Sequence, residues 1–268
     1  MDKRPVITLL TDYGMRDSYV GSIKGVICSI NPNANIIDIT HDIKGQDIIE
    51  AAFVLYTAYK YFPVRTIHVV IVDPTVGSNR RILLVVSDEY YFIAPDNGVL
   101  SLIYETGTVS TVYEVNAEHY YLSEVSPTFH GRDIIAPVAA WLSKGIESDK
   151  FGDPITDYFK LTLPKPRLMP PKALRGVAFH IDRFGNIISN ISSEDIKKAK
   201  EEYKSEKFKI IIGKFEINSL KNTYCEGNKG ELIALIGSSG FLEVASYQGD
   251  ASFIANACRG TEITLIFQ

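Results

Sequence analysis

A buried strand that ends in a charged loop is the feature that most constrains this chain. Residues 66–72 are almost entirely apolar or β-branched, which is typical of a strand buried on both faces of a sheet. Asp73 follows at once, Pro74 cannot continue the hydrogen-bond ladder, and guanidinium groups follow at Arg80 and Arg81. Ligands of open α/β sheets bind beyond the carboxyl ends of the strands, so these charges lie where a site is expected. This segment alone fits a structural turn with a salt bridge equally well.

The same arrangement recurs twice more along the chain. Apolar residues 6–10 run into Asp12, and the polar group around His130 precedes an apolar helical pattern at 134–142. Carboxylate, guanidinium and imidazole groups at strand ends and helix starts are typical of an active site. The sequence therefore predicts an enzyme rather than a purely structural protein.

Strand and helix patterns alternate over the first 160 residues. This alternation predicts a three-layer α/β domain with a mostly parallel sheet at residues 1–160. Residues 82–87 and 90–94 flank a short turn and predict an antiparallel hairpin inserted in that sheet. Asp96 and Asn97 are interpreted as turn formers. Helical spacing is found at residues 18–30, 48–62, 99–104 and 134–142.

The second half of the chain has a different composition. Residues 161–174 are rich in proline and predict a semi-rigid linker. Beyond it, short apolar runs alternate with Gly, Asn and Ser, and one helical pattern lies near 193–203. These features predict a smaller β-barrel-like domain at residues 175–268. Its predicted strands are residues 176–181, 187–191, 208–212, 232–236, 242–246, 252–255 and 263–267.

Charge and cysteine content narrow the class of protein. A net charge of -4 gives no electrostatic reason to expect a nucleic acid or an anionic membrane as partner. Three scattered cysteines argue for a reducing compartment and against a disulfide framework or a structural zinc site. No apolar run approaches the roughly 20 residues of a membrane span, and the first run is too short for a signal peptide. A cytoplasmic location is expected. Sequence motifs for nicotinamide cofactors, nucleoside triphosphates and zinc proteases are also missing.

Five motifs, taken in order, resemble one family. They are LTDYG at 10–14, VDPTVG at 72–77 followed by Arg80 and Arg81, APDNG at 94–98, FHGRD at 129–133, and DRFGN at 182–186. The family is the S-adenosyl-L-methionine (SAM) hydroxide adenosyltransferases, or SAM hydrolases, which are relatives of the SAM-dependent fluorinase and chlorinase. The resemblance covers nearly the whole chain. It implies an N-terminal α/β domain, a C-terminal barrel-like domain, and a homotrimer that binds SAM between subunits.

The resemblance also implies a reaction and the residues that perform it. Water attacks the ribose C5′ of SAM in line, giving adenosine and L-methionine, with SAM as substrate and with no cofactor and no metal. Asp73, Arg80 and His130 match the set that handles the water, and which of them is the base stays open. The expected substrate-binding residues are Asp12 for the ribose hydroxyls, Ser18, Asp182 and Ser238 for the methionine amine and carboxylate, and Phe184, Asn186 and Ala251 for adenine. For Ser238 and Ala251, ordinary turn formation and packing remain alternatives.

Departures from the halogenase pattern favour water as nucleophile. The sequence has Asp73 and Val76 where the fluorinase halide loop has Tyr and Thr, and a carboxylate repels an incoming halide. It also has Gln46 in place of a Trp and His130 in place of a Tyr. Three alternatives stay open: a non-catalytic SAM or adenosine sensor, a SAM-dependent halogenase, and a phosphoesterase with metal ligands at Asp12, Asp17, Asp73 and His130. The other histidines, His41, His68, His119 and His180, are expected to be structural or surface residues.

Overall fold

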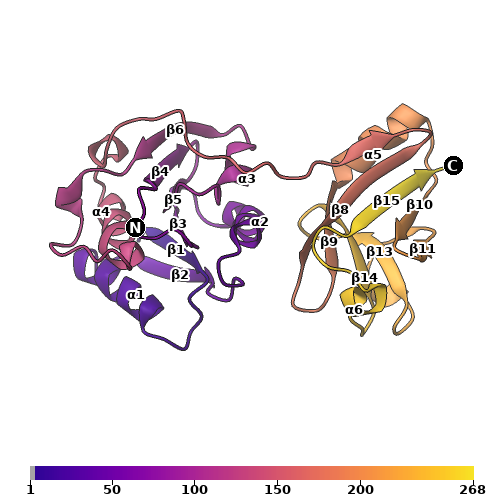
Figure 1. Cartoon of the computed structure of the whole chain (residues 1–268), viewed down its shortest axis with the longest axis horizontal. Coiled ribbons are helices and arrows are strands. Elements are labelled where there is room, and N and C mark those ends of the chain that lie inside the picture. The colour runs from indigo at the N-terminus through magenta and orange to yellow at the C-terminus, as the bar shows by residue number, and fades with distance from the viewer. Residues whose placement is uncertain (1–3) are drawn as a thin grey trace. The chain divides into compact units, whose positions relative to one another are not determined.

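The computed structural model describes residues 4–268, and these form two compact units, drawn in Figure 1. The first unit ends at Leu161 and the second begins at Thr162. Each unit contains its own hydrophobic core. The fold is mixed α/β, with a parallel-rich sheet in the first unit and a barrel-like sheet in the second, as the sequence predicts.

The first unit is built on a six-stranded sheet with the order β2-β1-β3-β5-β4-β6. Strands β2, β1, β3 and β5 are parallel, and β4 runs antiparallel to both β5 and β6. The hairpin predicted within the sheet is therefore present, as β4 and β5. The strands are β1 (Val6–Thr11), β2 (Asn35–Thr40), β3 (Ile67–Ile71), β4 (Ile82–Ser87), β5 (Tyr91–Pro95) and β6 (Val109–Glu114).

Helices cover both faces of this sheet (Figure 1). One face packs against α1 (Tyr19–Ile30) and α4 (Ala136–Ser143), and the other against α2 (Ile48–Ala58) and α3 (Ser101–Tyr104). The end of the predicted helix at 48–62 tightens into a 3₁₀ turn at Tyr59–Tyr61, before Pro63 stops it. A π-helical turn directly precedes α4.

Strand direction explains why the charged loops gather. The four parallel strands end at one edge of the sheet, so the loops that begin at Asp12, His41, Val72 and Asp96 share that edge. Strand β4 runs the opposite way and starts at this edge, because Ile82 pairs with Pro95. Arg80 and Arg81, just before β4, are thereby brought back to the carboxyl ends of the parallel strands.

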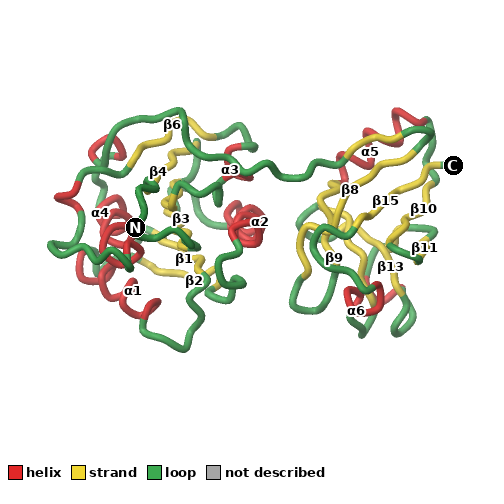
Figure 2. The backbone as a smooth tube through the Cα atoms, viewed as in Figure 1, coloured by secondary structure: helices red, strands yellow, loops and turns green. Residues whose placement is uncertain are grey.

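Strands are the main regular secondary structure of the second unit, as Figure 2 shows. The sheet follows the order β11-β10-β15-β8-β9-β14-β13-β12, with β7 paired to β8. Strand β7 and the start of β8 lie inside the proline-rich stretch at 161–174. The strands are β7 (Arg167–Met169), β8 (Ala173–Ile181), β9 (Ile187–Ser192), β10 (Phe208–Ile212), β11 (Phe215–Ile217), β12 (Leu220–Lys221), β13 (Leu232–Ile236), β14 (Phe241–Ser246) and β15 (Glu262–Phe267).

Two helices interrupt these strands. Helix α5 (Ser193–Tyr203) lies where the sequence predicts it and begins with a capping box between Ser192 and Asp195. The prediction of a strand at 252–255 is wrong, because these residues belong to α6 (Ala251–Ala255). The Asp250 side chain accepts the Phe253 N–H at 2.9 Å, and caps outweigh the apolar content of so short a run. Within residues 4–268, no helix combines the length and hydropathy needed to cross a membrane.

His68 lies at the centre of the first unit and has a structural role. Its side chain is fully buried on β3, Nδ1 lies 2.8 Å from the Thr8 hydroxyl, and the ring stacks on Phe92. Nε2 has no hydrogen-bond partner among the described residues. Burial lowers the pKa of His68 to about 3, so the imidazole is neutral in the folded protein.

This buried imidazole predicts loss of stability in mild acid. Below about pH 6.5 the unfolded chain binds a proton at His68 that the folded chain refuses until about pH 3, so the free energy of unfolding falls by about 1.4 kcal/mol per pH unit. Urea unfolding of the first unit, followed by fluorescence of Trp141, measures this slope. His68→Asn keeps a polar partner for the Thr8 hydroxyl but cannot titrate. It should be less stable at pH 7, and an equally steep loss towards pH 5 would contradict the assignment.

Candidate active site

Asp73, Arg80 and His130 form one continuous hydrogen-bonded set. Arg80 donates to Asp73 Oδ2 from Nε at 2.7 Å and from Nη2 at 2.6 Å. The same Nη2 lies 3.0 Å from His130 Nδ1. The side chains of Arg80 and Asp73 are only 8% and 6% exposed, so water screens this ion pair little. The structure thus brings together the three residues that the resemblance assigned to the nucleophilic water.

The loop after β3 is held in a single conformation by its neighbours. Asn97 donates from Nδ2 to the Val72 carbonyl at 2.8 Å, which fixes the end of the strand. Thr75 donates to Asp73 Oδ1 from its backbone N–H at 3.2 Å and from its hydroxyl at 3.1 Å. Gly77 has φ +82°, and a Cβ there would lie 2.4 Å from the Pro127 carbonyl oxygen. Only glycine allows this loop to pass the segment that leads to His130.

The contact with Arg80 determines the protonation state of His130. A guanidinium group can only donate, so Nδ1 must accept and the ring proton lies on Nε2. Burial and the positive charge of Arg80 lower the pKa of His130, against smaller opposite effects of Asp73 and Asp133. His130 is therefore neutral near pH 7 and presents an N–H donor.

Asp12 lies at the same edge of the sheet, in the loop between β1 and α1. Its Oδ2 accepts the Gln46 N–H at 2.8 Å, and Oδ1 makes no hydrogen bond within the described chain. The next residue, Tyr13, is close enough to Asp12, Asp73 and Arg80 for their charges to influence its pKa, which burial raises. Ser18 is exposed at the start of α1, with no side-chain hydrogen bond that caps the helix.

A second cluster lies on the second unit, in the turn between β8 and β9. Asp182 Oδ1 accepts the backbone N–H groups of Phe184 and Asn186, both at 2.9 Å, and Oδ2 accepts from the Asn186 amide at 2.9 Å. These bonds fix the side chains of Asp182 and Asn186 and the backbone at Phe184. Asn186 is buried, whereas the Phe184 ring is 76% exposed and can contact a ligand.

The start of α6 packs against this turn. Ser252 donates its backbone N–H to the Gly185 carbonyl at 2.9 Å, which places Ala251 beside the Asp182 turn. Ala251 is fully buried, so its side chain packs in the core. Ser238 is exposed in the turn between β13 and β14.

Sequence reasoning missed several residues of these clusters. Thr75 donates to Asp73, and Gln46, which the sequence marked only as a departure from the halogenases, donates to Asp12. Asn97 anchors the end of β3 and also forms the predicted turn, in which its Oδ1 accepts the Val99 N–H. Glu243 is 5% exposed on β14, hydrogen-bonded to Tyr224, and its pKa is raised by burial and by Asp182. A lone Glu in an apolar strand pattern was the only signal for it.

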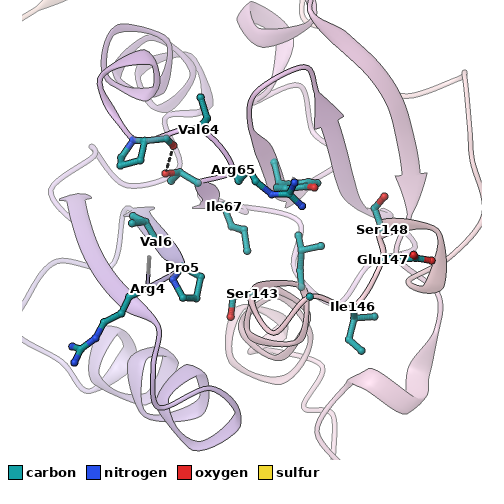
Figure 3. Close-up of a pocket in the computed structure, with 15 residues that line it drawn as sticks. Arg4, Pro5, Val6, Val64, Arg65, Ile67, Ser143, Ile146, Glu147 and Ser148 are labelled. Atoms are coloured by element: carbon teal, nitrogen blue, oxygen red, sulfur yellow. Dashed lines mark hydrogen bonds between the residues drawn. The ribbon is translucent and has the colours of Figure 1, made fainter. Parts of the chain in front are cut away.

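The set of Asp73, Arg80 and His130 coincides neither with a group of metal ligands among the described residues nor with the cavity of Figure 3. Among residues 4–268, no three His, Cys, Asp or Glu side chains are grouped as metal ligands, and Asp73 is paired with Arg80 instead. A cavity of about 760 Å³ lies at the opposite edge of the sheet, beside Val6 at the start of β1 and Ile67 at the start of β3 (Figure 3). Its lining contains no carboxylate–histidine pair.

Known proteins match this chain along nearly its whole length. The N-terminal and C-terminal domains of the SAM hydroxide adenosyltransferase family match residues 7–152 and 176–264. An (R)-S-adenosyl-L-methionine hydrolase of Methanocaldococcus jannaschii is 36% identical, over 98% of this chain and 96% of that one. A more distant relative is a fluorinase of Actinoplanes sp., 26% identical over 97% of each chain.

A solved structure gives the same result. The crystal structure of an uncharacterized conserved protein from Thermotoga maritima aligns with a TM-score of 0.90 and 36% identity, over 97% of this chain and 99% of that one. Similarity of this extent covers both units and all five motifs. The chain belongs to the SAM hydroxide adenosyltransferase family.

Proposed function

We propose that the protein hydrolyses SAM to adenosine and L-methionine. The observation that carries this function is the hydrogen-bonded Asp73–Arg80–His130 set at the carboxyl edge of the sheet, with Asp12 at the same edge. Relatives that match the whole chain are named SAM hydrolases, which supports the same reaction.

The substrate supplies its own activation. The oxygen of water forms a bond to C5′ while the C5′–S bond breaks, and the electron pair stays on sulfur, which leaves as the neutral thioether of methionine. One proton is released. No acid is needed for the leaving group, so the protein has to hold water in line with the C5′–S bond, which contributes several kcal/mol.

The hydrogen-bond directions assign roles in this step. Arg80 donates to both partners, and His130 presents Nε2–H, so neither accepts a proton in this arrangement. The carboxylate of Asp73 is the one acceptor of the three. Asp73 Oδ1 exchanges the hydrogen bond from the Thr75 hydroxyl, at 3.1 Å, for one from water and then takes the water proton, while His130 orients the water oxygen.

The other predicted residues bind the substrate. Asp12 accepts from both ribose hydroxyls, and Asp182 pairs with the methionine ammonium. The exposed ring of Phe184 stacks on adenine. Ser18 and Ser238 bind the amino acid end, and Asn186 with the Ala251 backbone completes the adenine pocket.

The assembly and location are part of the same proposal. We expect a homotrimer, with a mass by light scattering about three times the 29.9 kDa of the chain. Free, exposed thiols at Cys28, Cys225 and Cys258 fit a reducing, cytoplasmic compartment.

Chromatography of products tests the function. Purified protein incubated with SAM should release adenosine and methionine in equal amounts, with and without EDTA, and Asp73→Ala should release neither. Binding of SAM without turnover would instead indicate a sensor. Formation of 5′-chloro-5′-deoxyadenosine on addition of chloride would indicate a halogenase, which the carboxylate of Asp73 disfavours.

The lowered pKa of His130 predicts activity in mild acid. His130 must be neutral to accept from Arg80, and its folded pKa lies below the ordinary 6.5, so kcat/KM should stay level down to below pH 6.5 and then fall. Initial rates from pH 5 to 8 measure this limb. A fall that begins above pH 6.5, or an identical limb in His130→Asn, would contradict the role of the imidazole.

A further inference from the structure

A chain of polar contacts links the loop of Asp12 to the surface. The Thr11 hydroxyl lies 2.9 Å from His41 Nδ1, and His41 Nε2 lies 3.1 Å from Asp38 Oδ1. Asp38 Oδ2 in turn accepts from Lys24 Nζ at 2.6 Å. His41 is only 5% exposed, although it follows β2 in a polar loop. The expectation that His41 is a structural or surface residue leaves this contact with the loop of Asp12 unexplained.

His41 holds both sides of the turn that contains Asp12. Its backbone carbonyl accepts the Gly14 N–H at 2.7 Å, after Asp12 in the chain. Its ring contacts Thr11, before Asp12, and the Thr11 hydroxyl also accepts the Tyr13 N–H at 3.2 Å. Gly14 has φ +65°, so the turn is tight. His41 therefore contacts the turn on both sides of Asp12.

The contacts define one consistent set of proton positions. The negative charge of Asp38 favours the proton on Nε2, an electrostatic contact because Nε2 makes no well-aligned hydrogen bond. Nδ1 is then an acceptor for the Thr11 O–H, and the Thr11 oxygen is left to accept from Tyr13. Each hydrogen bond between Tyr13, Thr11 and His41 thus has one donor and one acceptor.

We propose that His41 is a positioning residue for the ribose of the substrate, an inference that rests on the proposed function. It acts through Thr11 and Gly14 on the turn, and so keeps Asp12 Oδ1 and Oδ2 directed at the 2′,3′-diol. Asp12 Oδ2 already accepts the Gln46 N–H. If the Asp12 carboxylate turns away, its hydrogen bonds to the two ribose hydroxyls are lost, while the rest of the nucleoside still binds.

Two substitutions of His41 separate the nitrogen atoms. His41→Asn keeps an oxygen at the position of Nδ1 and can accept from Thr11. His41→Gln extends its amide to the position of Nε2 and leaves Thr11 without its acceptor. The backbone contact to Gly14 is the same in both, which makes them a matched pair.

Binding of adenosine and of 2′,3′-dideoxyadenosine, measured by calorimetry, gives a readout that a general structural role would not move. In His41→Gln, adenosine should bind about 10-fold more weakly, as expected for a lost hydrogen bond to a charged group, with dideoxyadenosine unchanged. KM for SAM should rise by a similar factor, with kcat within about 3-fold. His41→Asn should restore most of the adenosine affinity.

A milder variant covers the case in which His41→Gln fails to fold. Asp38→Asn removes the charge next to Nε2 from a carboxylate that is 35% exposed. The substitution should weaken the binding of adenosine about 3-fold and leave the binding of dideoxyadenosine unchanged, since the His41 ring loses only the charge that favours one tautomer. Asp42→Asn is the control, because Asp42 is exposed and directly follows His41 in the chain. It should change the binding of neither ligand.

The outcomes distinguish this inference from the proposed function. If wild-type protein binds neither SAM nor adenosine, the proposed function fails. If the wild type hydrolyses SAM and prefers the diol, but the His41 and Asp38 variants keep that preference or lose both ligands equally, only the role of His41 is overturned.

Discussion

Asp73→Asn is expected to lower kcat for SAM hydrolysis about 10³-fold with little change in KM. Asparagine has the shape of aspartate, but it cannot take a proton from water, and general base groups contribute 10²–10⁴-fold. The substitution also leaves the buried guanidinium of Arg80 without a charged acceptor. Steady-state release of adenosine at saturating SAM measures the effect.

The neighbouring ion pair provides a matched control. Arg81 donates to Asp96 Oδ2 from Nη2 at 2.7 Å, and the Asp96 side chain is 5% exposed. Asp96→Asn thus removes the carboxylate from a second Arg–Asp pair, whose arginine directly follows Arg80 in the chain. It should lower the melting temperature but leave kcat within about 3-fold. Equal losses of kcat in the two variants would show that Asp73 acts through stability alone.

The fold could be predicted because its patterns are long and consistent. The β-branched run at 66–72 has no stable alternative to a buried strand, and helical spacing persists over three turns in α1. Short segments behaved differently. The apolar run at residues 252–255 is only as long as one helical turn. The Asp250 carboxylate caps this segment, which stabilises it as a helix.

The candidate site could be predicted as a set of residues but not as a network. Asp73 and Arg80 are seven positions apart, and a charge after a buried strand marks an edge of the sheet. Two supporting contacts come from distant parts of the chain: Asn97, in the loop after β5, donates to the Val72 carbonyl, and Gln46, in the loop before α2, donates to Asp12. Such pairings depend on the register of the sheet and on loop paths, which local patterns do not contain. The acceptor state of His130 Nδ1 likewise follows only from its 3.0 Å contact.

Arg80→Lys tests whether the geometry of the set or its charge matters more. Arg80 reaches Asp73 with Nε and Nη2 while Nη2 also lies against His130 Nδ1. The lysine ammonium is a single point charge on a flexible stem, and it can pair with Asp73 but cannot keep the fork that spans both partners. His130 then loses the contact that fixes its tautomer and the direction of Nε2–H.

We therefore expect kcat of Arg80→Lys to fall about 10²-fold, between the wild type and Asp73→Asn, because charge is kept and orientation is lost. Arg81→Lys is the control, since Arg81 also forks between two partners, Asp96 and Asp157, but contacts neither Asp73 nor His130. Its kcat should stay within about 3-fold. If Arg80→Lys kept more than half of the wild-type rate, positive charge near Asp73 would suffice, and the orientation of His130 would have no part in the reaction.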